Sequence, residues 1–285
     1  MTNLLKSAAA IITFLFSTQI SNSQETKIDN SLLWEISGNG LEKSSYLYGT
    51  LHMMCDKDFV IKEKVKIAFE KTEELALELD FDDLNELKAM QKMTVADEQL
   101  SKTLTKEEYK KLNDFLVSTI GSNAAQFENA TFLSIMSTVM MKSLNCPLKV
   151  YEFEFMKMAM KKKNQILGLE KVQDQMDAFE KSFNFKDFLN QLSEYNPSYF
   201  SEMVKIYNQE NINNLYEMVT DKKFMNKASQ ELMLDNRNAN WLKLMPEMMN
   251  QKSMFFAVGA GHLPGNMGVI NLLRKAGYTV KPILD

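Results

Sequence analysis

The feature that most constrains the fold of this chain is a short unit that occurs twice, once near each end. Each copy consists of an apolar stretch, a Gly-x-x-His tetrapeptide, a helical pattern and a second apolar stretch. The tetrapeptides are Gly49-Thr50-Leu51-His52 and Gly259-Ala260-Gly261-His262, and they hold the only two histidines of the chain. With 10 glycines in 285 residues, two histidines would both follow a glycine at this spacing in roughly one of 800 random placements. The repetition therefore indicates two related structural units.

The elements around each tetrapeptide predict a strand, a loop, a helix and a returning strand. In the first unit these are residues 46–48, 49–52, 61–71 and 75–80, and in the second 255–258, 259–262, 266–275 and 278–283, with Gly277 as the helix C-cap. Strand-helix-strand units are right-handed, and open α/β sheets bind ligands beyond the carboxyl ends of their strands. If both units share one sheet, the two imidazoles converge at that edge.

The order of elements predicts an α/β (α+β) fold with a central mixed sheet. Residues 24–285 form one domain, divided into a first unit (24–82), a mainly helical middle (83–250) and a second unit (251–285). The middle contains a predicted strand at 166–170 and a helix that begins at the capping box Thr105 to Glu108 and ends at Gly121. We expect its helices to form a cap on the sheet.

The amino terminus has the pattern of a secretory signal. A basic start, an apolar core at residues 7–16 and small residues at 21–23 predict cleavage near Gln24. No later stretch is apolar enough to span a membrane, so we expect no transmembrane anchor in the mature chain. The protein is expected in the periplasm or outside the cell. A net charge of -4 and a pI near 5.5 argue against nucleic acid as a partner.

Two cysteines, Cys55 and Cys146, are compatible with a disulfide in an exported protein. Such a bridge would fix the first histidine loop against the helical middle. Free thiols are the second possibility. Metal ligation is the third, but the cysteines are 91 residues apart, unlike the close Cys-x-x-Cys spacing of zinc sites.

The 21 methionines allow two interpretations. Most of them occur at helical spacing among leucine and phenylalanine, which is typical of adaptable core side chains. Clusters such as Met53-Met54 beside His52 also fit copper binding in exported proteins. We favour the role in the core.

Two histidines and one carboxylate form a common metal-binding set that leaves positions open for water and substrate. Glu78 is the natural third ligand of His52 and His262, because it lies in the strand that completes the first unit. Asp80 is a weaker candidate. The donors fit a divalent ion such as Zn, Mn, Co or Fe, which would lower the pKa of a bound water and make it a nucleophile. The competing interpretations are structural, hydrogen-bonded histidines and an exposed acid on the strand.

Several segments resemble the TraB/PrgY/GumN family, whose superfamily includes the Tiki proteases. The resemblance spans nearly the whole mature chain, and its segments are Leu33-Trp34-Glu35-Ile36, residues 46–53, Leu77-Glu78-Leu79, Gly168-Leu169-Glu170 with Gln175, Arg237-Asn238 with Trp241, and residues 257–265. It implies a metal-dependent site of peptidase or hydrolase type built from His52, His262 and Glu78.

The resemblance also makes Arg237 a candidate for binding a substrate carboxylate or an oxyanion, with a structural ion pair to Glu170 or Asp235 as the alternative. Glu170 is then expected to border the same cleft. The loop amides at Gly49, Gly259 and Gly261 are expected to contact substrate. One departure is Asn236, which stands where many relatives have an acid and weakens the case for a fixed acid-arginine pair at that place.

Two functions are compatible with these residues. The first is a secreted, metal-dependent hydrolase acting on a peptide or small molecule through a metal-activated water held by His52, His262 and Glu78. The second is a binding protein that sequesters a peptide signal, haem or metal in the same cleft. A third, structural role in envelope assembly is less favoured. An open coordination position beside the imidazoles would distinguish a hydrolase from a closed binding site.

Overall fold

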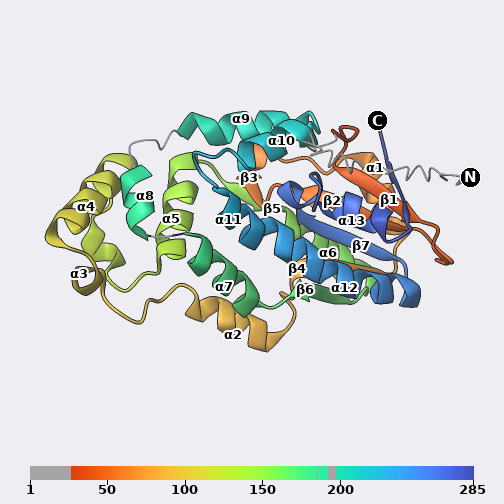
Figure 1. The fold of residues 1–285 in the computed structure, drawn as a ribbon, viewed down its shortest axis with the longest axis horizontal. Coiled ribbons are helices and arrows are strands. Elements are labelled where there is room, and N and C mark those ends of the chain that lie inside the picture. The colour runs from red at the N-terminus through yellow and green to blue at the C-terminus, as the bar shows by residue number, and fades with distance from the viewer. Residues whose placement is uncertain (1–26, 184, 192–196) are drawn as a thin grey trace, which may run out of the picture.

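A six-stranded mixed sheet forms the centre of the protein in the computed structural model, which describes residues 27–183, 185–191 and 197–285 (Figure 1). The predicted signal sequence, residues 1–23, lies outside the described residues. The strands follow the order β6-β4-β7-β2-β1-β8. Their bounds are Leu33–Ser37 (β1), Ser45–Thr50 (β2), Glu74–Leu79 (β4), Ile166–Glu170 (β6), Met254–Gly259 (β7) and Thr279–Pro282 (β8). The prediction of a mixed sheet with many helices is confirmed.

The two Gly-x-x-His units meet at the middle of this sheet. Strands β2 and β7 are parallel neighbours, with Tyr46 opposite Phe255 and Thr50 opposite Gly259. Both tetrapeptides therefore leave the sheet at the same edge. From this pair the chain crosses in opposite directions, from β2 past β7 to β4 and from β7 past β2 and β1 to β8. Ligand sites of open α/β sheets are found where the chain direction reverses in this way.

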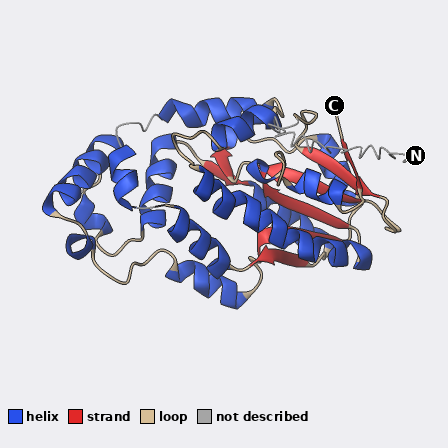
Figure 2. Ribbon diagram, viewed as in Figure 1, coloured by secondary structure: helices blue, strands red, loops and turns tan. Residues whose placement is uncertain are grey.

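Helices cover both faces of the sheet, as Figure 2 shows. On one face, α1 (Glu63–Glu70), α6 (Tyr151–Lys162) and α9 (Pro197–Asn208) pack on the strands, with buried side chains that include Phe69, Phe155 and Tyr207. On the other face lie α12 (Asn236–Gln251) and α13 (Val269–Lys275), which bury Trp241, Met245 and Ile270. Burial of methionines such as Met245 in this core agrees with the interpretation of methionine as core residue.

The helical middle extends from the sheet and contains a third apolar cluster (Figure 1). Its helices are α2 (Leu84–Lys92), α3 (Leu100–Thr103), α4 (Lys106–Ile120), α5 (Phe132–Leu144), α7 (Val172–Ser182), α8 (Phe185–Gln191) and α10 (Ile212–Val219). The capping box of Thr105 and Glu108 begins α4, and Gly121, with a φ of 66°, ends it, as predicted. Within the described residues, no helix has the length and apolar character needed to cross a membrane.

A small two-stranded sheet was not predicted from the sequence. Strand β3 (Met53–Cys55) pairs in antiparallel fashion with β5 (Leu148–Val150). Each strand has only three residues, which is too short to produce an alternating pattern. Because β3 directly follows His52 and β5 directly precedes α6, this sheet joins the first histidine loop to the start of that helix.

The second difference concerns residues 224–244, where the helical spacing of the apolar residues predicts one helix. The structure has a short helix α11 (Lys227–Gln230), one π-helical turn (Glu231–Asp235) and then α12, which continues to Gln251 through Pro246. Proline normally interrupts a helix because it lacks an N–H donor. Here Met245 and Met249 on either side of Pro246 are buried against the sheet, and this packing outweighs the lost hydrogen bond.

Candidate functional site

The predicted site residues lie in a row at the carboxyl ends of the four parallel strands. Glu170 ends β6, Glu78 lies near the end of β4, His262 follows β7 and His52 follows β2. Because the spatial order of these strands is β6-β4-β7-β2, residues from distant parts of the sequence are brought together. The expected convergence of the two imidazoles at one sheet edge is therefore observed.

Gly259 lies at the centre of this row. A Cβ atom added to it would lie 3.2 Å from Nε2 of His52, 3.2 Å from Oε1 of Glu78 and 3.5 Å from Cδ2 of His262. Any side chain at this position would enter the space between the three groups. The glycine of the second tetrapeptide is thus explained by the close approach of the candidate ligands to the backbone.

His52 is held through its Nδ1 atom. This atom lies 2.9 Å from Oε1 of Glu152, which also accepts a hydrogen bond from the Thr50 hydroxyl at 2.9 Å. The backbone carbonyl of His52 accepts a hydrogen bond from the amide of Tyr151. Desolvation opposes a charged ring, but the hydrogen bond and the negative charge of Glu152 raise the pKa of His52 to about 9. The side chain of His52 is 59% exposed, and its Nε2 atom faces Gly259.

His262 is buried and held in the same manner. Its Nδ1 atom lies 2.7 Å from Oδ1 of Asn238, and its Nε2 atom lies 3.2 Å from Nη1 of Arg237. Since a guanidinium group can only donate, Nε2 accepts this hydrogen bond and Nδ1 carries the proton that is donated to Asn238. Burial, together with the positive charge of Arg237, lowers the pKa of His262 to about 3. Its ring also packs 4.5 Å from that of Trp241.

Arg237 connects the two carboxylates of the site. Its Nη2 atom lies 2.7 Å from Oε2 of Glu78 and 2.5 Å from Oε1 of Glu170, and Gln175 donates hydrogen bonds to both acids. Oε1 of Glu78 accepts the amide of Gly259 at 2.7 Å. Burial alone would raise the pKa of Glu78, but the charge of Arg237 holds it well below its usual value. Glu78 is therefore ionised.

The predicted ion pair of Arg237 with Glu170 is present, and Glu78 is its second partner. Asn236, the residue before Arg237, is exposed. The acids that bind Arg237 come from β6 and β4 instead. The π-helical turn also contributes, because the carbonyl of Met233 accepts a hydrogen bond from Nη1 at 2.9 Å. Single π-helical turns are often found at functional sites.

Glu152 was missed by the sequence analysis. It lies in the first turn of α6 and is buried, and its Oε2 atom has no hydrogen-bond partner within the described residues. In the sequence, Glu152 and Glu154 occur two residues apart in the same apolar stretch. Nothing local distinguishes them, because only the unpredicted sheet β3–β5 brings Glu152 beside His52.

The remaining predicted residues lie at the margin of the site. Gly49 is buried in β2 against Ala260, and a Cβ atom added to Gly261 would lie 3.4 Å from Cγ1 of Val219 in α10. Asp80, the weaker ligand candidate, accepts hydrogen bonds from the amides of Asp82 and Asp83. These hydrogen bonds give Asp80 a role in the turn after β4.

The donor atoms at this edge of the sheet are of the kinds that bind a divalent ion. Both imidazoles have Nδ1 fixed by an acceptor and Nε2 turned toward the site, which is the usual arrangement of metal-binding histidines. The acids Glu78, Glu152 and Glu170 outnumber Arg237, so the region favours a cation. The donors do not yet have the spacing of ligands around one ion, because Nε2 of His262 lies 3.9 Å from Oε1 of Glu78, whereas two ligands of a tetrahedral ion lie about 3.3 Å apart. The described residues hold no ready-made cluster of three ligands. The residues fit a metal in kind and orientation, provided that Nη1 of Arg237 releases His262.

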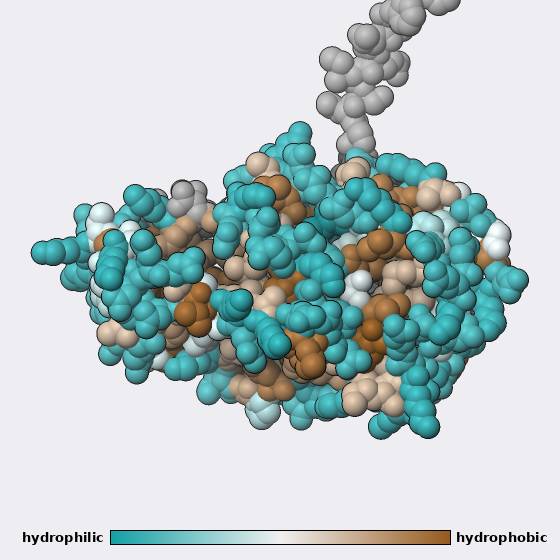
Figure 3. Space-filling model, turned by 90° about the horizontal axis from the view of Figure 1, so that it is seen from below, coloured by the Kyte–Doolittle hydropathy of each residue, from teal (hydrophilic) through white to brown (hydrophobic). Residues whose placement is uncertain are grey.

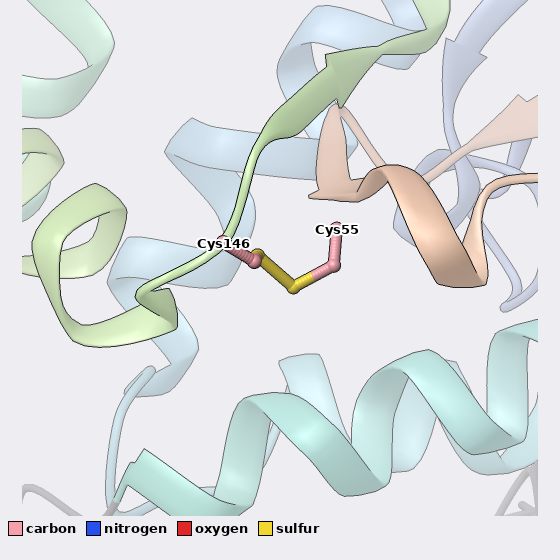
Figure 4. Close-up of a disulfide and its surroundings, with 2 residues drawn as sticks. All are labelled: Cys55 and Cys146. Atoms are coloured by element: carbon pink, nitrogen blue, oxygen red, sulfur yellow. A yellow bond between two sulfur atoms is a disulfide. The ribbon is translucent and has the colours of Figure 1, made fainter.

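The predicted disulfide between Cys55 and Cys146 is present, with the two Cα atoms 5.6 Å apart (Figure 4). Cys55 lies in β3, three residues after His52, and Cys146 lies just before β5. The bridge therefore fastens one end of the small sheet, and His52 and Glu152 lie at its other end.

We expect the double variant Cys55→Ser, Cys146→Ser to lose about 2–5 kcal/mol of unfolding free energy, because a bridge over a long loop restricts the unfolded chain. Urea unfolding measures this loss. Dithiothreitol should destabilise the wild type by a similar amount and leave the double variant unchanged. A reductant effect of equal size in both proteins would contradict this explanation.

The opposite pKa shifts of the two histidines predict that the free energy of unfolding decreases at low pH because of His262 and at high pH because of His52. We call these two decreases the acidic flank and the alkaline flank. His262 stays neutral when folded and becomes protonated when unfolded, so its contribution falls as the pH drops from about 6.5 toward 3, by about 1.4 kcal/mol per unit. His52 contributes below pH 6.5 and loses this contribution as the pH rises through about 9. Its flank is shallower because the side chain is more than half exposed.

Urea unfolding in the presence of a chelator, across this pH range, tests both flanks. His262→Gln should flatten only the acidic flank and His52→Gln only the alkaline one, so that each variant is the control for the other. If either substitution leaves its own flank unchanged, the assigned charge state is wrong.

The chain is similar to known proteins along most of its length. The model of the TraB/PrgY/gumN family matches residues 32–282. The chain is also similar to the metalloprotease TIKI1 of Xenopus tropicalis, with 24% identity over 91% of this chain and 62% of that protein. The chain thus spans less than two thirds of the length of this relative. No solved structure matches.

Proposed function

This chain belongs to the TraB/PrgY/gumN family, and from the site at the edge of its sheet we propose that it is an exported, metal-dependent hydrolase that cleaves peptides. The observation that carries the proposal is the approach of His52, His262 and Glu78 to one point beside Gly259. Peptides are the proposed substrate class because the chain is similar to a metalloprotease.

In this proposal, Nε2 of His52, Nε2 of His262 and Oε1 of Glu78 would hold the divalent ion. When bound, such an ion polarises a scissile carbonyl and lowers the pKa of water. Glu152 and Asn238 orient the imidazoles through Nδ1. His52 must lose its proton to act as a ligand, so binding of the ion is favoured at higher pH.

Arg237 supplies the positive charge of the site. Its guanidinium is buried between Glu78 and Glu170 and stays charged. The hydrogen bond from Nη1 to His262 is the one that a bound ion would replace, and this frees Nη1 to donate to a substrate oxygen. The amide of Gly259 already donates to Glu78 and fixes the carboxylate in place.

A non-catalytic binding protein is the second candidate, and one observation favours it. Nε2 of His262 is already engaged by Arg237, as in a site where the histidine is a structural residue. In that case the same edge of the sheet would bind a peptide without cleaving it.

Export is part of the proposal. The disulfide between Cys55 and Cys146 is compatible with an oxidising compartment. The signal-like pattern at residues 1–23 supports it from the sequence.

The experiment that distinguishes the two functions is metal analysis of the purified protein together with a peptide-library cleavage assay. The wild type should retain a divalent ion and cleave peptides, whereas His52→Ala and His262→Ala should lose both properties. If all three proteins hold equal amounts of metal and none cleaves a peptide, the hydrolase proposal is wrong.

A further inference from the structure

A hollow of about 620 Å³ lies alongside the edge strand β6 and next to the candidate site. Residues 167–171 of the chain line it, helices α7 and α12 form its walls, and Glu170 and Arg237 belong to both the hollow and the ion network. Figure 3 views the protein from the side on which β6 lies in Figure 1, where hydrophobic patches are interspersed among hydrophilic side chains. The hollow is within the size range of ligand pockets.

The hydrogen-bond pattern of β6 determines which of its backbone groups face away from the sheet. The amide of Leu75 in β4 donates to the carbonyl of Gln165, and Leu75 is aligned with Ile166. In a parallel pair, this register directs the N–H and C=O groups of Leu167 and Leu169 toward β4. The same groups of Ile166, Gly168 and Glu170 therefore point outward.

At Gly168, the outward edge of β6 is not paired with another described strand. No other element within the described residues hydrogen-bonds its outward groups. An added Cβ would lie 2.7 Å from the amide nitrogen of Asp80, so the close turn after β4 requires glycine here. An edge strand with free N–H and C=O groups is a template for another strand.

The charges around the hollow are largely paired. Nζ of Lys181 lies 3.6 Å from Oδ2 of Asp177, and Nζ of Lys171 lies 3.3 Å from Oε1 of Glu86. Arg237 is bound by Glu170. Leu244, on the wall formed by α12, is 45% exposed. These walls offer apolar contact and little net charge, so the free backbone groups of β6 are the main source of recognition.

We propose that β6 binds the peptide substrate as an added strand. The peptide backbone pairs with the outward groups of Gly168 and its neighbours, and the peptide then passes Glu170 and crosses the strand ends that carry Glu78, His262 and His52. Recognition through the backbone makes the site tolerant of peptide sequence. This inference rests on the proposed function, because it assigns the place where the substrate binds.

The first test is a scan of a cleaved peptide in which one backbone amide at a time is N-methylated. Loss of a strand hydrogen bond should raise KM by about tenfold at alternate residues and leave the residues between them unaffected. A scan without this alternation would overturn the proposal.

The second test fills the hollow. Asn240 is exposed on α12 and lines it, so Asn240→Trp should raise KM by about tenfold with little change in kcat. Met160→Trp is the matched control, since Met160 is 67% exposed on α6, away from the hollow, and it should behave as the wild type. Equal KM values in the two variants would also overturn the proposal.

Hydrogen exchange of residues 166–170 separates this proposal from the proposed function. With a pool of random-sequence peptides and EDTA to stop cleavage, exchange of this segment should slow in the wild type but not in Asn240→Trp. Protection without any cleavage activity would support the strand site and contradict the hydrolase. Cleavage without protection would retain the hydrolase and exclude β6 as the binding strand, and the absence of both effects would contradict both.

Discussion

Replacement of Glu78 by glutamine is expected to lower kcat/KM for peptide cleavage by about a thousandfold. Glutamine has nearly the same shape, so the amide of Gly259 keeps an acceptor at Oε1. The substitution removes the negative charge that faces both imidazoles and that the proposed ion requires. Metal content of the purified variant, measured beside the kinetics, should fall as well.

Glu170→Gln is the matched control. It also removes one carboxylate from Arg237, but Glu170 lies on the far side of the guanidinium from the histidines. We expect a decrease of about tenfold and unchanged metal content. Equal losses in both variants would mean that the acids act only by positioning Arg237, and a Glu78→Gln variant with wild-type activity would exclude Glu78 as a ligand.

The sequence was sufficient to predict that the two histidine units share one sheet. Each tetrapeptide follows a short apolar strand, and parallel strands release their loops at one edge, so the convergence of His52 and His262 follows from local patterns. Glu78 was predicted for the same reason, because the strand that contains it completes the first unit. The pairing of β2 with β7 agrees with this expectation.

The groups that orient the site could not be predicted in the same way. Glu152 reaches His52 only because β3 pairs with β5 over nearly 100 residues of sequence, and strands of three residues leave no periodic signal. The π-helical turn before Arg237 likewise leaves no recognisable pattern in the sequence. Local patterns therefore predict the residues that converge, whereas long-range pairing decides which side chains hold them.

Arg237→Ala is expected to lower the unfolding free energy by about 3–5 kcal/mol, because it leaves Glu78 and Glu170 buried without a cationic partner. Urea unfolding measures the loss. Adding Glu170→Gln to this variant should recover part of it, since one of the two unpaired charges is then removed. A loss below about 1 kcal/mol would mean that the two acids remain solvated without Arg237.

The same variant also distinguishes a cation site from a purely structural network. In the wild type, the guanidinium binds Oε2 of Glu78 and occupies Nε2 of His262, the atom for which a cation would compete. Without it, Mn²⁺ or Zn²⁺ should stabilise Arg237→Ala by more than the wild type, because a ligand that binds only the folded state raises the melting temperature. The additional substitution Glu78→Gln should abolish this difference. If neither ion raises the melting temperature of Arg237→Ala, the acids and histidines at this edge of the sheet do not form a metal site.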